Sequence, residues 1–225
     1  MADMVMEAKR QLIDIGRQIA AKGLVIGPGG NTSLRAGALM VISASGSSFE
    51  CSDESDYVAI DIETGKQVDG GKRPSSEVLM HLECYRRRPD VNAVVHTHPT
   101  WSTSVASSGT KMPPMFPDYV VFVGKPATLD YVIPTTKLLA DAVAEVIGEH
   151  NVVLMSNHGV LAVAGDLKMA LLRVELAEEN ARMLAIANSL GKARSLTDAE
   201  VQAIYDLESE KYRQRLLKNE GGKQS

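Results

Sequence analysis

Segments with a helical spacing of apolar residues alternate with short apolar runs along the chain. Over residues 4–22, apolar side chains recur three and four positions apart, which predicts an amphipathic helix that ends before Gly23. The same pattern predicts further helices over residues 75–88, 136–149, 167–190 and 198–217. A capping-box pair, Thr197 and Glu200, marks the start of the last of these helices.

The short apolar runs predict strands. They cover residues 39–43, 57–61, 91–95 and 152–155, and a run over 160–163 continues the last strand or forms its hairpin partner. Glycine and proline at residues 27–30 predict a loop. Because neither an internal repeat nor a linker rich in proline and serine divides the chain, the sequence predicts one α/β domain over residues 1–225.

The composition argues against several classes of partner and location. Of the 225 residues, 44% are hydrophobic and 23% are charged, which is typical of a globular protein. The formal net charge of −4 and the pI of about 5.8 give no electrostatic reason to expect nucleic acid or an anionic membrane as partner. Two cysteines, no apolar run near the roughly 20 residues of a membrane span, and no secretion signal at the N-terminus lead us to expect a cytoplasmic protein.

Histidines at the ends of two predicted strands are the first candidates for chemistry. His96 and His98 directly follow one strand, and in extended backbone residues two apart point to the same side. His158 follows another strand and would complete a set of three nitrogen ligands, which suits a catalytic zinc ion with an open position. Two histidines with this spacing also occur by chance. We assign the remaining histidines, His81 and His150, to a helix surface or to packing.

Three polar segments have the donors that an anion requires. Asn31 lies in a run of glycine, asparagine and hydroxyl residues, and Ser45 and Gly46 form a second short loop. Ser75 and Ser76 lie at a predicted helix start, where free N–H groups and the helix dipole favour a phosphate. The alternative for each segment is an ordinary turn or helix cap. No segment matches the fingerprints of ATP or dinucleotide binding.

Taken in order, five sequence blocks give the chain a resemblance to the class II aldolase/adducin family. The blocks are GGNTSLR at 29–35, ISASG at 42–46, KRPSSE at 72–77, AVVHTHP at 93–99 and NHG at 157–159. The resemblance implies a three-layer α/β/α fold with a central mixed, largely antiparallel sheet. It also implies a homotetramer with active sites at the subunit interfaces.

The resemblance also implies roles for residues in the metal site. His96, His98 and His158 match the three metal ligands of the family, with zinc expected and manganese or cobalt as alternatives. Glu77 matches the acid/base that lies beside the metal and ligates it before the substrate displaces it. Tyr119 matches a tyrosine that reaches in from a neighbouring subunit as proton donor.

For the substrate, the resemblance implies a phosphate cradle and a carbon–carbon cleavage. Asn31, Ser75 and Ser76 match the cradle, together with the loop of Ser45 and Gly46. The implied reaction cleaves a phosphorylated ketose of the L-fuculose 1-phosphate kind to dihydroxyacetone phosphate and a small aldehyde through a metal-stabilised enediolate.

Relatives with other activities remain as alternatives. Thr97, between the histidines, and Asp118 are similar to residues of sugar-phosphate 4-epimerases, although those enzymes carry aspartate in place of Glu77. Residues 98–103 are similar to those of 3-oxo-tetronate 4-phosphate decarboxylases, which tend to carry lysine in place of Ser76. An adducin-like binding module is disfavoured, because such proteins lack the metal histidines that this chain has.

Overall fold

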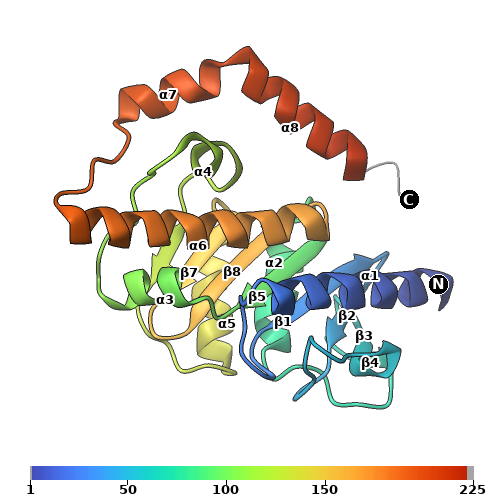
Figure 1. Ribbon diagram of the computed structural model, residues 1–225. Helices are drawn as coiled ribbons and strands as arrows, with labels where there is room; N and C mark the ends of the chain where they lie inside the picture. The colour runs from blue at the N-terminus through green and yellow to red at the C-terminus, as the bar shows by residue number, and fades with distance from the viewer. Residues whose placement is uncertain (1, 222–225) are drawn as a thin grey trace.

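An eight-stranded sheet forms the centre of the protein, which we describe over residues 2–221 in a computed structural model (Figure 1). The strands are β1 (Asn31–Ala36), β2 (Leu39–Ser43), β3 (Tyr57–Asp61), β4 (Gln67–Asp69), β5 (Ala93–Thr97), β6 (Ala127–Leu129), β7 (Val152–Met155) and β8 (Gly159–Ala164). Their order is β4-β3-β2-β1-β5-β8-β7-β6. Only β6 and β7 pair in parallel, and the other neighbours pair antiparallel. The predicted mixed, largely antiparallel sheet is confirmed.

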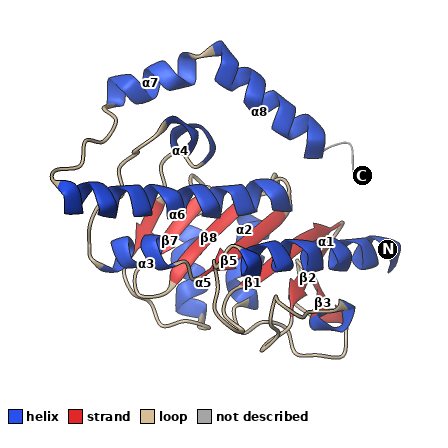
Figure 2. Ribbon diagram, viewed as in Figure 1, coloured by secondary structure: helices blue, strands red, loops and turns tan. Residues whose placement is uncertain are grey.

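Helices cover both faces of this sheet (Figure 2). They are α1 (Ala2–Ala21), α2 (Val78–Arg87), α3 (Thr100–Ser107), α4 (Pro117–Phe122), α5 (Lys137–Val146), α6 (Leu167–Leu190), α7 (Asp198–Asp206) and α8 (Glu208–Gly221). The helices α1, α3 and α6 lie on one face, and α2 and α5 lie on the other. α7 packs on α4, and α8 continues along an arc away from the sheet (Figure 1). None of the helices in the described part of the chain has the length and apolar character that a membrane span requires.

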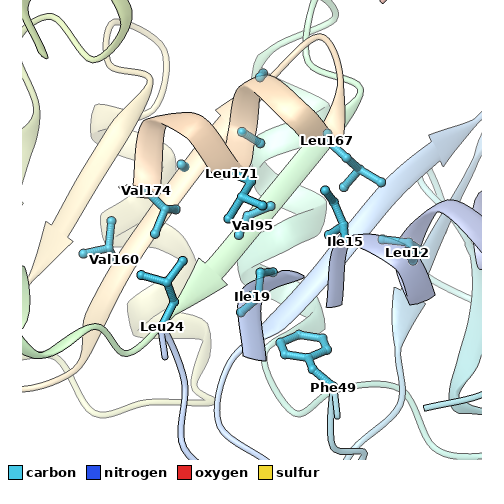
Figure 3. Close-up of a cluster of buried hydrophobic side chains, with 14 of the residues drawn as sticks. Leu12, Ile15, Ile19, Leu24, Phe49, Val95, Val160, Leu167, Leu171 and Val174 are labelled. Carbon is cyan, nitrogen blue, oxygen red and sulfur yellow. The ribbon is translucent and has the colours of Figure 1, made fainter. Parts of the chain in front are cut away.

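The period of two along the strands divides the core into two layers. On β2, Val41 packs with α1 and α6, whereas its neighbours Met40 and Ile42 pack with α2 and α5. Figure 3 shows the first layer, in which Leu12, Ile15 and Ile19 of α1 meet Leu167, Leu171 and Val174 of α6 over the sheet. The buried strands are apolar on both sides because both faces are covered.

The predicted elements agree best with the structure where the pattern was long or strictly apolar. Strand β7 and helix α6 cover the predicted residues, and α1 differs by two residues at its start and one at its end. The predicted helix over 198–217 is wrong in its extent, because the backbone at Leu207 is extended and separates α7 from α8. Helix α2 begins at Val78, three residues after the predicted start at Ser75, whose N–H instead donates to the carbonyl of Ser43 at 3.0 Å.

Truncation of Ile19 tests the packing of the first layer. Ile19 is fully buried, so Ile19→Ala should lower the free energy of unfolding by about 2–5 kcal/mol, measured by urea denaturation. The matched control is Ile26→Ala, because Ile26 is 90% exposed, and it should change stability by no more than about 0.5 kcal/mol. Equal effects of the two substitutions would contradict this assignment of the core.

Candidate metal centre and active site

Three histidines meet where strand β5 ends and strand β8 begins. His96 lies in β5 opposite Leu161 of β8, and His98 follows β5 and donates its N–H to the carbonyl of Leu24 at 3.1 Å. His158 lies in the tight turn between β7 and β8, next to Asn157, whose positive φ of 57° is one that asparagine tolerates. The ring centroids are 4.8 to 5.5 Å apart, and the candidate ligand atoms lie within 4.8 Å of one another.

A buried carboxylate joins this cluster. Glu77, the residue before α2, places Oε2 3.2 Å from Nε2 of His96 and Oε1 3.1 Å from Nε2 of His158. Nε2 of His96 also lies 3.0 Å from Nε2 of His98. Residues far apart in the sequence therefore present three imidazole nitrogens and one carboxylate to a common point.

The chemistry of these donors fits a divalent cation. A carbonyl oxygen only accepts, so Nδ1 of His96, 3.0 Å from the carbonyl of Val160, must donate its proton. A neutral His96 ring then presents an unshared electron pair at Nε2, facing both the Glu77 carboxylate and the His98 ring. Such electron-rich atoms in contact require a proton or a cation among them, and three nitrogens with a carboxylate are ligands that zinc prefers.

The ionisation states expected near neutral pH are those that bind metal. Burial opposes ionisation of Glu77. When the site holds a proton on His96 in place of a metal, the charge of His96 and hydrogen bonds from His158, His96 and Asn31 outweigh burial and hold the pKa of Glu77 well below its usual range. Burial, together with the neighbouring imidazoles of His96 and His158, lowers the pKa of His98 to about 4. An ionised carboxylate and a neutral imidazole bind a metal without first releasing a proton.

Asn31 connects this cluster to His81, a buried histidine of α2. Nδ2 of Asn31 donates to Oε2 of Glu77 at 2.8 Å, and its Oδ1 lies 2.6 Å from Nε2 of His81. His81 is fully buried, so of the two assignments made from the sequence, a helix surface or packing, only packing agrees with the structure. The sequence did contain a signal, because His81 lies four residues after Glu77 and such residues share one face of a helix.

The residues of the predicted phosphate cradle lie around the start of α2. Ser45 donates its N–H to the carbonyl of Arg73 at 2.9 Å, which joins the loop of Ser45 and Gly46 to the segment before Ser75 and Ser76. Ser45, Gly46 and Ser76 are exposed, and Gly46 adopts the positive φ of 79° that favours glycine. Ser75 is buried, and its Oγ accepts the N–H of Glu77 at 3.2 Å.

Not every predicted donor is free in this arrangement. The amide of Asn31 is already bonded to Glu77 and to His81, so its contact with a phosphate stays a prediction.

Tyr119 lies in the core of its own subunit. It is fully buried in α4, 6.2 Å from the ring of Phe116 between centroids, and its hydroxyl has no hydrogen-bond partner among the described residues. Burial raises the pKa of Tyr119 above its usual range. This environment is typical of a packing residue, and its action in a neighbouring subunit's site stays a prediction. The adjacent Asp118 is half-buried and pairs with Arg213 of α8 at 3.0 Å.

Comparison with known proteins decides the family. The model of the class II aldolase and adducin N-terminal domain matches residues 10–185. The chain belongs to this family.

Several class II aldolase relatives match most of the chain. It is 32% identical to a 5-deoxy-D-ribulose 1-phosphate aldolase of Bacillus thuringiensis serovar kurstaki, over 89% of this chain and 95% of the relative. It is 33% identical to an L-fuculose phosphate aldolase of Methanocaldococcus jannaschii, over 82% of this chain and 98% of the relative. A solved structure of an L-fuculose 1-phosphate aldolase superposes with a TM-score of 0.82 at 34% identity and covers 88% of this chain and 94% of that chain.

The class II aldolase family also includes matches with other activities. A 3-oxo-tetronate 4-phosphate decarboxylase of Haemophilus influenzae is 30% identical over 87% of this chain, and an L-ribulose-5-phosphate 4-epimerase of Salmonella paratyphi C is 33% identical over 84% of it. The chain is an enzyme of the class II aldolase type. Class II aldolases depend on a metal, and the histidine cluster of this chain fits one.

Substitution of Gly159 tests whether close packing behind the histidines forms the site. A Cβ there would collide with the Thr97 carbonyl oxygen and lie 2.8 Å from Cδ2 of His98 and 3.1 Å from Cε1 of His96. Gly159→Ala should therefore weaken metal binding and destabilise the fold by about 1–3 kcal/mol. Metal analysis and thermal unfolding measure both effects. Gly165→Ala is the matched control, because its Cβ would meet no atom within 4 Å, and an equal loss in both variants would contradict the geometry.

Proposed function

We propose that this chain is a zinc-dependent aldolase that cleaves a phosphorylated ketose to dihydroxyacetone phosphate and a small aldehyde, with a substrate of the L-fuculose 1-phosphate kind. The observation that carries the proposal is the buried Glu77 carboxylate, 3.1 and 3.2 Å from the imidazoles of His158 and His96. Two similar proteins named as aldolases of ketose 1-phosphate or fuculose phosphate substrates support it.

His96, His98 and His158 would hold the ion, with Glu77 beside it. When bound there, a divalent ion supplies a Lewis acid that stabilises negative charge on the oxygens of the ketose. Manganese or cobalt is the alternative to zinc, because the donor set does not exclude either ion.

Glu77 is the group placed to move a proton in this reaction. In cleavage, a carbon–carbon bond breaks and its electron pair stays with the dihydroxyacetone phosphate fragment, so one carbon of that fragment gains a proton. The hydroxyl that becomes the aldehyde oxygen loses a proton. We assign the first transfer to Glu77, which must be protonated to give that proton and afterwards returns to its favoured charged form. We assign the second to Tyr119 of a neighbouring subunit in a homotetramer, whose neutral phenol would take up the hydroxyl proton only as it passes its own proton on, so that Glu77 is protonated again for the next turnover.

Donors around the start of α2 are proposed to bind the substrate phosphate. The exposed Ser76, Ser45 and Gly46 offer hydroxyl and N–H groups, and the buried Ser75 directly precedes Ser76. Asn31 donates to Glu77 at 2.8 Å, so a phosphate bound by Asn31 would lie next to the acid/base. Such a site needs no basic surface, which agrees with the net charge of −4.

Product analysis separates this reaction from decarboxylation and 4-epimerisation, the activities of similar proteins. Purified enzyme would be incubated with a panel of phosphorylated ketoses and 3-oxo acids, and assayed for dihydroxyacetone phosphate, carbon dioxide and epimerised sugar. We expect dihydroxyacetone phosphate, lost on chelation and restored by zinc. Carbon dioxide or an epimer as the main product would replace the proposed reaction with that of the corresponding relative.

Glu77→Gln tests the role of the carboxylate. The amide keeps the size but neither the charge nor the basicity of the side chain, so kcat should fall by at least about 10²-fold while three histidines retain most of the metal. Metal content and kcat would be measured on one preparation, with Glu83→Gln on the outer part of α2 as the matched control. Parallel loss of metal and activity would make Glu77 chiefly a ligand, and retention of both would disprove the proposed mechanism.

Ser76→Ala tests the phosphate cradle. Ser76 is exposed at the start of α2, and loss of one charge-assisted hydrogen bond should cost about 1.5–3 kcal/mol, seen mainly as a higher KM. Kinetics on the dephosphorylated ketose provide the control, because Ser76→Ala should not weaken the binding of a substrate that lacks phosphate. An equal change in KM for both substrates would remove Ser76 from the cradle.

A further inference from the structure

A chain of buried hydrogen bonds ends on the Glu77 carboxylate. Tyr85 Oη lies 2.8 Å from Ser33 Oγ, and Ser33 Oγ lies 2.7 Å from Nδ1 of His81. Nε2 of His81 lies 2.6 Å from Oδ1 of Asn31, whose Nδ2 lies 2.8 Å from Oε2 of Glu77. All of these side chains are buried, so each contact is protected from exchange with bulk water.

Only one direction of proton donation satisfies every contact in this series of hydrogen bonds. The ionised Glu77 only accepts, so the amide nitrogen of Asn31 faces it and the amide oxygen faces His81. His81 must then carry its proton on Nε2, which leaves Nδ1 to accept from the hydroxyl of Ser33. Ser33 in turn accepts from Tyr85, because the second acceptor near the Tyr85 hydroxyl, the carbonyl of Asn92, is more distant at 3.4 Å.

Local periodicity brings the five residues together. Glu77, His81 and Tyr85 are spaced four apart and therefore lie on one face of α2 and its first turn. Asn31 and Ser33 are two apart on β1 and point to the same side of the sheet. Side chains from one helix face and one strand face alternate along the chain of hydrogen bonds, so neither element completes it alone.

The ring of His81 is a neutral link in this chain. Burial lowers the pKa of His81 to about 3, with a smaller effect from His96 when that ring is protonated, so the His81 ring carries one proton near neutral pH. The ring forms no ion pair of its own among the described residues. It acts as donor on one side and acceptor on the other, which fixes both the tautomer and the orientation of the ring.

We propose that His81 is a positioning residue for catalysis, which holds the Asn31 amide and through it the Glu77 carboxylate in the orientation that faces the three metal histidines. The inference rests on the proposed function, because it assigns the purpose of the hydrogen-bond chain to the acid/base role of Glu77. Without the His81 ring, Oδ1 of Asn31 loses its donor, the amide is free to rotate, and Oε2 of Glu77 loses its fixed N–H partner. Partners behind a metal or proton-transfer group commonly contribute about 10- to 100-fold to activity.

The first arm of the test observes the tautomer and needs no activity. Nitrogen NMR of the ¹⁵N-histidine-labelled enzyme, assigned with a His81→Gln variant, should show the His81 ring neutral with its proton on Nε2. A ring protonated on Nδ1, or on both nitrogens at neutral pH, would overturn the proposal. The tautomer is read on the wild-type enzyme, so this arm does not depend on the folding or the activity of His81→Leu.

The second arm measures kinetics on zinc-loaded variants. His81→Leu removes the donor and should lower kcat by about 10- to 100-fold with KM and bound zinc nearly unchanged, whereas His81→Gln keeps an N–H donor and should recover most of kcat. His81→Leu should have little further effect in a Glu77→Gln background, because a residue that acts through Glu77 has no effect once Glu77 is gone. His150→Leu, at a half-exposed histidine bonded to the Lys125 carbonyl, is the control.

The outcomes separate this inference from the proposed function. A kcat for His81→Leu within about twofold of wild type, or an equal loss in the Glu77→Gln background, would overturn the positioning role while ketose cleavage stands. Wild-type enzyme that has the expected tautomer but cleaves no ketose would contradict the proposed function and leave the hydrogen-bond chain in place.

Discussion

A negative charge buried among unshared electron pairs is the constraint on which the site depends. Glu77 is only 7% exposed, and an ion removed from water costs several kcal/mol unless its surroundings compensate it. The surrounding atoms are imidazole nitrogens and one amide, and at least one of those imidazoles turns an electron pair toward the carboxylate. A divalent cation compensates all of these groups at once, which explains why residues so distant in sequence converge.

The sheet topology supplies the convergence. Strand β5 lies between β1 and β8, so Asn31 is opposite His96 on one side and Leu161 is opposite it on the other. The turn into β8 adds His158, and α2 starts beside the end of β2, where Ser75 bonds to the carbonyl of Ser43. Covering helices on both faces exclude water from the strands, and the chemistry is confined to the place where β5 ends and β1 and β8 begin.

The sequence predicted those parts of the molecule that depend on local periodicity. The spacing of His96 and His98 placed both rings on one side because strands have a period of two, and α6 was predicted to the residue because its pattern is long. Strand β1 was not predicted, because its first residues are polar and because its place between β2 and β5 is set by tertiary pairing. The role of His81 was missed for a related reason, since its partners Asn31 and Ser33 come from that same unpredicted strand.

The central claim is that His96, His98 and His158 bind a divalent metal ion beside Glu77. X-ray absorption at the metal edge of the purified enzyme, combined with metal analysis, tests it most directly. We predict about one zinc ion per chain, with nitrogen ligands at about 2.0–2.1 Å that are lost when any of the three histidines is replaced by alanine. A metal whose ligand shell is unchanged in His158→Ala, or a fully active enzyme that contains no metal, would contradict the account.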